Sequence, residues 1–177
     1  FDTAVFPPVS PATITVLTPL PQLTQGNLTI DASNTGVMLD GQYMSGPGHG
    51  LDIEADGNAI MGLQIINFPD TAIAAGSSYN TIGGDRTVGT GPTGQGNVLG
   101  NNDTAIFLGN FNTVTGNLIG TDASGTVAMG NYYGIRVGAY NEIGRNTPGE
   151  RNIISASVYV GVSLPSGHAH SNEIVGN

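Results

Sequence analysis

Residues 112–137, NTVTGNLIGTDASGTVAMGNYYGIRV, decide the fold because they hold one complete unit of a pattern that recurs along the chain. Three short apolar runs follow one another in this stretch, at residues 112–114, 117–119 and 134–137. Glycine and asparagine separate the runs, and both residues favour turns. No helical spacing of apolar residues joins the runs. The stretch therefore predicts three short strands separated by tight corners.

The same three runs return on both sides of this stretch. Asparagine begins the first run of a unit at positions 58, 80, 112, 141 and 172, and the shortest spacing, between 58 and 80, is 22 residues. We interpret that spacing as the bare unit and the longer spacings as units with loops inserted at their corners. The other expected runs are, in order, 28–30, 37–39, 51–53, 63–65, 72–74, 98–99, 105–108, 153–154 and 160–162.

A sequence period of 20 to 50 residues is typical of solenoids. Three strands per period, without helices, predict an all-β fold: a single-stranded right-handed parallel β-helix of about five to six coils. We expect the proline-rich residues 1–26 to form an N-terminal cap with a first strand at 13–16, in which Ile14 and Val16 face the core. Residues 27–177 are expected to form the coils of one domain, with the last unit cut at residue 177.

The asparagine that opens each first run predicts a ladder of side-chain amides. Amide groups at the same corner of successive coils can hydrogen-bond along the axis of the solenoid. We therefore expect a structural role for five residues: Asn58, Asn80, Asn112, Asn141 and Asn172.

Composition and charge exclude several classes of partner. Charged residues make up only 10% of the chain, against roughly 25% in ordinary soluble domains. The net charge is -9 and lysine is absent, which argues against nucleic acids and anionic membranes because binding to phosphates needs basic side chains. No run of about 18 apolar residues is present, so we expect no membrane insertion.

The repeats resemble a known group of proteins. The pattern NxIxG, residues 116–135 (GNLIGTDASGTVAMGNYYGI) and residues 151–155 (RNIIS) are similar to the parallel β-helix repeats of bacterial secreted and cell-surface proteins. Residues 11–41 look like the usual opening of such surface β-helices. The resemblance implies a pectate-lyase-like fold and an extracellular or cell-surface location. It leaves the activity open, because pectate lyases, polygalacturonases, phage tailspikes and non-catalytic adhesins share this architecture.

The third runs carry the most varied exposed residues of the repeat. Alternation along these strands turns Phe107, Arg136 and Tyr159 outward on successive coils. Aromatic rings on either side of a guanidinium can stack on sugar rings or on a partner protein. The alternative is that all three are ordinary solvated strand residues.

Two sets of residues have the chemistry of metal ligands. Asp52, Glu54 and Asp56 occupy alternate positions, a spacing that can surround Ca²⁺ when backbone carbonyls complete the shell. His168 and His170 alternate in a polar loop and could supply two imidazoles. The alternative is that the acids are solvated and that the histidines belong to a flexible loop without a third ligand.

We assign no catalytic residue. Glu142 and Glu173 should lie about one strand spacing apart, near the roughly 5–5.5 Å of a retaining glycosidase, but on a flat face without a nearby arginine. The segment from Gly48 to Gly50 matches the Gly-His-Gly element of polygalacturonases. It stands in a different order from that family's other elements, and the chain contains no Asp-Asp pair.

The expected function is therefore non-catalytic: an extracellular β-helix with a structural, adhesive or self-assembling role. Unpaired strand edges at its ends favour an end-to-end homo-oligomer or filament. The alternative is a β-helix that binds or degrades a polysaccharide. It would use the third-run face or the enlarged corners that carry Asp85, Arg86, Arg145, Glu150 and Arg151. A groove lined by three or more carboxylates and an arginine would favour this alternative.

Overall fold

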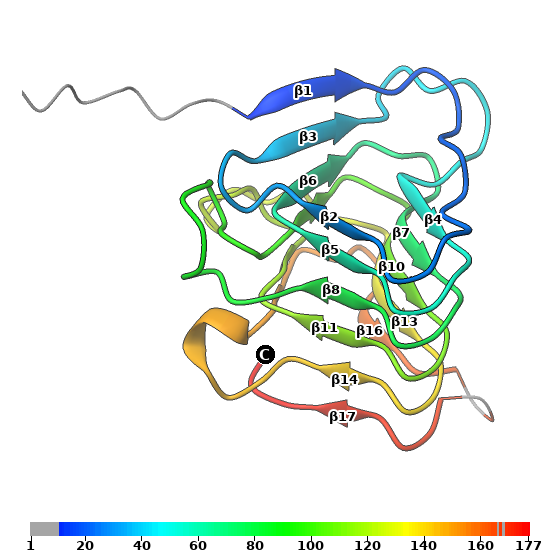
Figure 1. Ribbon diagram of the computed structural model, residues 1–177, viewed down its shortest axis with the longest axis vertical. Helices are drawn as coiled ribbons and strands as arrows, with labels where there is room; N and C mark the ends of the chain where they lie inside the picture. Colours follow the sequence, from blue (N-terminus) through cyan, green and yellow to red (C-terminus); the bar gives the residue numbers. More distant parts are fainter. Residues whose placement is uncertain (1–10, 166, 168) are drawn as a thin grey trace, which may run out of the picture.

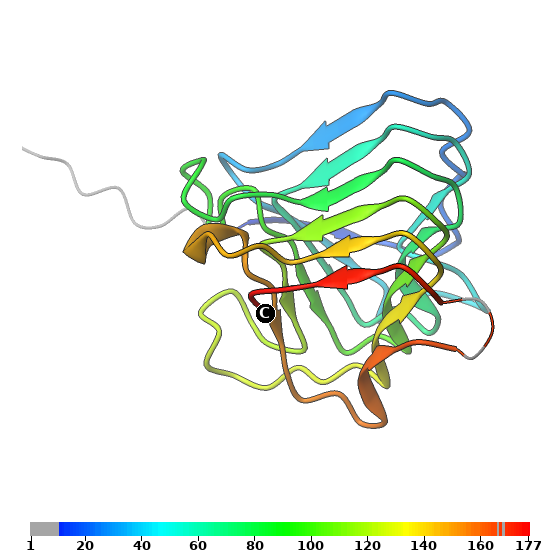
Figure 2. The same cartoon turned by 90° about the horizontal axis from the view of Figure 1, so that it is seen from below.

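Three parallel sheets wrap around one continuous interior (Figure 1). The computed structural model describes residues 11–165, 167 and 169–177. Residues 1–10 of the expected cap, and His168 of the expected histidine pair, lie outside the described residues. Figure 2 shows the strands of one sheet lying one above another in the order of the sequence, from blue to red.

Each sheet collects one class of run. The first sheet contains β2 (Thr29–Asp31), β5 (Ala59–Met61), β8 (Thr81–Gly83), β11 (Thr113–Thr115), β14 (Glu142–Ile143) and β17 (Glu173–Ile174). The second sheet contains β1 (Ala12–Thr15), β3 (Val37–Asp40), β6 (Leu63–Ile66), β9 (Val98–Gly100), β12 (Leu118–Ile119) and β15 (Ile153–Ile154). The third sheet contains β4 (Leu51–Ile53), β7 (Thr71–Ala75), β10 (Thr104–Leu108), β13 (Tyr133–Val137) and β16 (Val160–Ser163).

Six strands in two sheets and five in the third make about six coils with three strands per coil. Every expected run overlaps one of these strands. The predicted all-β parallel solenoid is therefore confirmed. The only helix among the described residues is the short 3-10 helix η1 (Pro148–Glu150) in a corner loop, and no helix there is long and apolar enough to cross a membrane.

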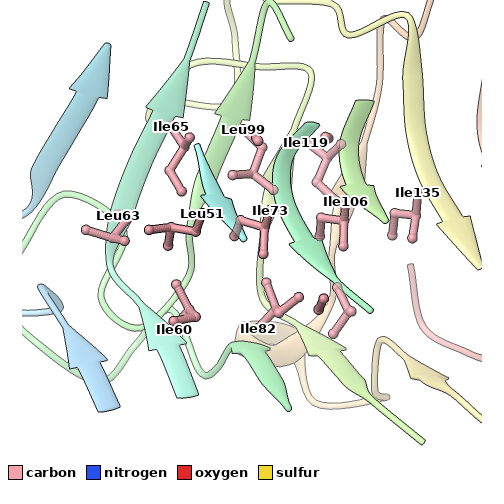
Figure 3. Packing of buried hydrophobic residues seen from close by; sticks show 14 of the residues in the cluster. Leu51, Ile60, Leu63, Ile65, Ile73, Ile82, Leu99, Ile106, Ile119 and Ile135 are labelled. Carbon is pink, nitrogen blue, oxygen red and sulfur yellow. The ribbon is translucent and has the colours of Figure 1, made fainter. Parts of the chain in front are cut away.

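The interior is filled by columns of aliphatic side chains, one side chain from each coil. In the third sheet Ile73 pairs in register with Ile106, which pairs with Ile135, and all three are fully buried. The other two sheets add similar columns, so the rows meet in the centre of the solenoid (Figure 3). Burial of such a side chain contributes about 1.5–3 kcal/mol. Stacking of equivalent side chains on successive coils therefore holds the repeat in register.

The first strand lies where the proline-rich segment predicts a strand, but one of its two expected core residues is exposed. Among the described residues, strand β1 is the edge strand of the second sheet and pairs with β3 alone. Val16 is 3% exposed, as expected, whereas Ile14 is 51% exposed. The expectation for Ile14 was wrong because alternation along one strand does not show whether another coil covers its side chain.

The predicted asparagine ladder is confirmed at the corner that leads into the first sheet. The backbone N–H of Asn58 donates to Oδ1 of Asn80, and the N–H of Asn80 donates to Oδ1 of Asn112, each at 2.8 Å. Asn112, Asn141 and Asn172 continue the same pattern. Each amide thus satisfies a backbone donor on the preceding coil that would otherwise be buried without a partner.

Two further ladders were not predicted from the sequence. Asn97, Asn117 and Asn152 occupy the corner into the second sheet, where the N–H of Asn97 donates to Oδ1 of Asn117 and that of Asn117 to Oδ1 of Asn152. Asn102 and Asn131 do the same at the corner into the third sheet, at 2.9 Å. All three corners of the solenoid therefore use the same amide chemistry.

The enlarged corners between the first and second sheets pack on one another. Residues 84–97 reach one end of the solenoid, where the N–H of Gly91 donates to the carbonyl of Ser33 at 2.8 Å. Toward the other end, the Arg86 guanidinium donates to the carbonyls of Pro148 and Arg151. This loop therefore lies along several coils as a strap.

Candidate functional site

The outer face of the third sheet carries a groove that follows the axis of the solenoid. Parallel pairing places Asp52 beside Ala74, Ala74 beside Phe107, Phe107 beside Arg136, and Arg136 beside Ser163. The row therefore begins with an acid, continues through two small or apolar positions, and reaches an arginine. These residues come from five different coils.

Two adjoining hollows form this groove. The first has a volume of about 330 Å³ and is lined by His49, Asp52, Glu54, Asp70, Thr71, Ala74, Gly76, Phe107 and Arg136. The second, of about 210 Å³, shares Phe107 and Arg136 and is otherwise apolar, lined by Leu108, Val137, Gly138 and Pro165. We call the two hollows together the third-sheet groove.

Small residues explain why the face is hollowed at this point. Ala74 and Gly76 lie between the acidic residues of the preceding coil and the Phe107–Arg136 pair of the following coils. A methyl group and a hydrogen leave room where larger strand side chains would fill the surface. The groove thus has a low floor at strand β7 and higher walls on either side.

The acidic end of the groove is held by short-range contacts. The Gln22 amide donates to Oδ2 of Asp52 at 2.8 Å, and the Thr71 hydroxyl donates to Oδ1 of Asp70 at 3.3 Å. His49 Nδ1 lies 3.6 Å from Oδ2 of Asp70 and has no hydrogen-bond partner among the described residues. An imidazole nitrogen and three carboxylates therefore face the same hollow with unused hydrogen-bonding capacity.

Aromatic rings hold the arginine at the other end. The Arg136 guanidinium lies 5.2 Å from the ring centre of Tyr133 and 6.0 Å from that of Phe107. Tyr133 in turn makes edge-to-face contacts with Tyr132 and Tyr159, at 5.0 Å and 5.4 Å between ring centres. Contacts of a guanidinium with aromatic faces are favourable and restrict its orientation.

The structure brings together two of the three residues expected on this surface. Phe107 and Arg136 are neighbours, as the alternation predicts. Tyr159 does not lie beside Arg136, because Ile135 pairs with Val162 rather than Val160, which moves Ser163 into the neighbouring position. Tyr159 stacks on Tyr132 instead, at 5.8 Å. It reaches Arg136 only through Tyr133.

The three carboxylates expected to bind Ca²⁺ do not gather at one point. Asp52 and Glu54 line the groove, whereas Asp56 accepts a hydrogen bond from the N–H of Ser78 at 2.8 Å and lies outside the groove lining. Across residues 11–165, 167 and 169–177, no three His, Asp or Glu side chains are placed to hold a metal ion together. The placement of these residues lends no support to a calcium site.

The sequence reasoning missed Asp70 and did not connect His49 with the acids. Asp70 directly precedes strand β7, at a corner of the coil. Aspartate is an ordinary turn residue, so its presence at a corner does not by itself indicate a site. His49 precedes strand β4 of the preceding coil. The one or two residues before each third run were the available signal, since these short segments lie next to one another at one edge of the third sheet.

The enlarged corners use their charges internally. Arg145 binds Glu142 at 2.6 Å and Glu150 at 3.0 Å, and Arg86 donates to backbone carbonyls. Glu142 is paired in register with Glu173, as expected, but the expected absence of a nearby arginine was wrong. These contacts favour a structural role for the corners.

This ion pair predicts a pH dependence of stability. The hydrogen bond from Arg145 holds the pKa of Glu142 below its ordinary value, so the pair stabilises the fold above the unfolded-state pKa and is lost as the pH falls through the folded-state pKa. Between neutral pH and about pH 3 the wild-type protein should lose about 0.2–1 kcal/mol more stability than the Glu142→Gln variant. Urea unfolding at both pH values measures this difference. Glu173→Gln is the control and should behave as wild type; equal pH dependence in wild type and Glu142→Gln would contradict the prediction.

A larger hollow, of about 400 Å³, lies at the corner between the second and third sheets. It is lined by Gly41, Gln42, Met44, Asn67, Phe68, Pro69 and Asn101, none of them charged. The third-sheet groove combines acidic, basic and aromatic groups, and we therefore take it as the candidate site.

Searches of protein-family models, of curated proteins and of solved structures returned no match to this chain.

Proposed function

We propose that this protein is an extracellular β-solenoid that binds a polysaccharide chain in the third-sheet groove and serves as an adhesive surface without catalytic activity. The observation that carries the proposal is the lining of the groove, which combines three carboxylates, an arginine and an exposed phenylalanine. A likeness of the repeats to pectate-lyase-like secreted proteins is consistent with this location and ligand class.

The chemistry of the groove suits sugars. Carboxylates accept hydrogen bonds from hydroxyl groups, and a guanidinium donates them in a fixed fork. The Phe107 ring, which is 40% exposed, offers an apolar face to a sugar ring. The five strands of the third sheet span roughly 19 Å along the axis, since neighbouring strands lie about 4.8 Å apart. A chain of several sugar units therefore fits along the groove.

The phenylalanine provides the direct test. Phe107→Ala should weaken polysaccharide binding about two- to tenfold, because ring contacts contribute about 0.5–1.5 kcal/mol beyond simple burial. Affinity electrophoresis in gels containing individual neutral and charged polysaccharides measures the change. The matched control is Phe111→Ala: Phe111 is 43% exposed but lies at the corner after the third sheet, stacked between Tyr79 and Tyr140.

Two results would overturn the proposal. If no polysaccharide of a broad panel retarded the protein in the gel, the proposed binding function would be wrong. If Phe107→Ala and Phe111→Ala weakened binding equally, the third-sheet groove would not be the binding site. Release of reducing ends or of unsaturated sugars from any member of the panel would replace the adhesive role by an enzymatic one.

End-to-end assembly stays a prediction. Among the described residues, strands β15, β16 and β17 at one end of the solenoid, and β1 and β2 at the other, each have one edge without a neighbouring strand, whereas Leu23 pairs with the outer edge of β4. Such unpaired edges can pair with another chain. Sedimentation velocity over a wide concentration range tests this, and a sedimentation coefficient independent of concentration would contradict it.

A further inference from the structure

The two ends of the third-sheet groove carry opposite charges that do not neutralise one another. Among the described residues, side-chain ion pairs join Arg145 to Glu142 and Glu150, and Nδ1 of His49 lies 3.6 Å from Oδ2 of Asp70. Asp52, Glu54 and Arg136 take part in none of them, although all three line the same hollow. The groove is therefore bipolar.

The separation follows from the register of the third sheet. Asp52 and Arg136 occupy the same row, three strand spacings apart, with Ala74 and Phe107 between them. Three spacings correspond to roughly 14 Å between the backbone positions. The rings of Tyr133 and Phe107 also hold the guanidinium over the aromatic side of the groove. The rings thus hold the arginine in the groove, where its N–H groups can donate to an anionic group.

Arg136 differs in this respect from the three other arginines. Arg86 and Arg151 donate to backbone carbonyls and Arg145 to carboxylates, whereas Arg136 has no hydrogen-bond acceptor within the described part of the chain. A guanidinium without a counter-ion matches carboxylate, sulfate or phosphate groups in a bidentate manner. Two carboxylates without a counter-ion match an ammonium group or sugar hydroxyls.

A ligand of uniform charge fits this groove poorly. A polymer with anionic groups along its length would be repelled by Asp52, Glu54 and Asp70. The net charge of -9 on the whole protein would add to this repulsion. A polymer with only cationic groups would meet Arg136. A wholly neutral chain could hydrogen-bond to both sets of charges but would give neither set a counter-ion, and pairs in which both partners are charged are the stronger ones. Charge complementarity therefore requires both signs in one ligand.

We propose that the ligand is a zwitterionic glycan, in which an anionic group binds Arg136 and an amino group binds Asp52 and Glu54. This inference rests on the proposed binding of a polysaccharide in the third-sheet groove and names the class of that polysaccharide. The apolar second hollow, beyond Arg136, takes the uncharged continuation of the chain.

The test uses one oligosaccharide backbone in four forms: neutral, carboxylated, aminated, and both carboxylated and aminated. Isothermal titration calorimetry should show the doubly substituted form binding about tenfold more tightly than the neutral form. In the Arg136→Gln variant, adding the carboxylate to the oligosaccharide should no longer increase its affinity. In the Glu54→Gln variant, adding the amino group should increase the affinity less than it does in the wild type. Arg151→Gln makes the same change in net charge outside the groove and should leave both gains intact.

The outcomes separate this inference from the proposed function. Equal affinity for all four forms, tightest binding of the carboxylated form, or equal effects of Arg136→Gln and Arg151→Gln would overturn the zwitterionic ligand while leaving polysaccharide binding in place. If none of the four forms bound and no polysaccharide of the broad panel did, the proposed function and this inference would both fall.

Discussion

Replacing Asn117 by alanine is expected to lower the free energy of unfolding by about 3–5 kcal/mol, because several buried polar groups lose their partners at about 1–3 kcal/mol each. Asn117 is fully buried at the corner into the second sheet. Its Oδ1 accepts from the backbone and the side chain of Asn97, at 3.1 Å and 2.9 Å. Its Nδ2 donates to the carbonyls of Ile82 and Thr115, at 2.9 Å and 3.0 Å. Nδ2 also donates to Oδ1 of Asn152 on the following coil at 3.1 Å, so one side chain links three coils.

The measurement is equilibrium urea unfolding followed by circular dichroism. Asn146→Ala is the matched control, because Asn146 is exposed on an enlarged corner, and its stability should stay within about 0.5 kcal/mol of wild type. Asn117→Asp should be at least as harmful as Asn117→Ala, since it places an unpaired charge in the interior. A loss below about 1 kcal/mol for Asn117→Ala would show that the ladder is not needed for stability.

Replacing Gly116 by alanine is expected to destabilise the fold by about 3 kcal/mol or more, through two separate causes. The residue has a φ of +66°, a left-handed conformation that costs other residues about 1–2 kcal/mol. A Cβ atom there would also lie 1.8 Å from the carbonyl oxygen of Gly84 on the preceding coil. Backbone atoms cannot turn aside as a flexible side chain can, so the two coils would have to separate.

Gly125→Ala distinguishes the two causes. Gly125 has a similar φ of +72°, but nothing lies within 4 Å of the position of its Cβ. This variant should therefore lose only the conformational cost of about 1–2 kcal/mol. Thermal and urea unfolding of both variants give the difference, which reports the close approach of the coils. Equal losses for the two variants would mean that the coils can move apart without cost.

The sequence predicted part of the candidate site. Phe107 and Arg136 were expected on one exposed surface because strand alternation applies to each third run separately. The position of Tyr159 was wrong because that prediction also required the register between strands β13 and β16. The chain between these strands runs through β14, η1 and β15, so alternation within β16 does not decide which of its residues lies beside Arg136. The pairing of Ile135 with Val162 decides it.

His49 and Asp70 show a second reason for the limits of sequence reasoning. Both residues lie just outside strands, where no periodicity constrains the direction of a side chain. Their nitrogen and oxygen come within 3.6 Å only because the coils stack. The hollow beside them also depends on the small size of Ala74 and Gly76, because larger side chains at these two positions would fill it. A small residue in a strand predicts nothing until its neighbours on other coils are known.

The sequence by itself determined the strands, their grouping into three sheets, the number of coils and the first asparagine ladder. These features repeat at short and regular distances, so each copy of the unit supports the interpretation of the others. Only the tertiary structure decided the use of the enlarged corners, the two further ladders and the bipolar third-sheet groove. These depend on contacts between side chains from different coils, whose partners are set by the packing of the whole interior rather than by any local pattern.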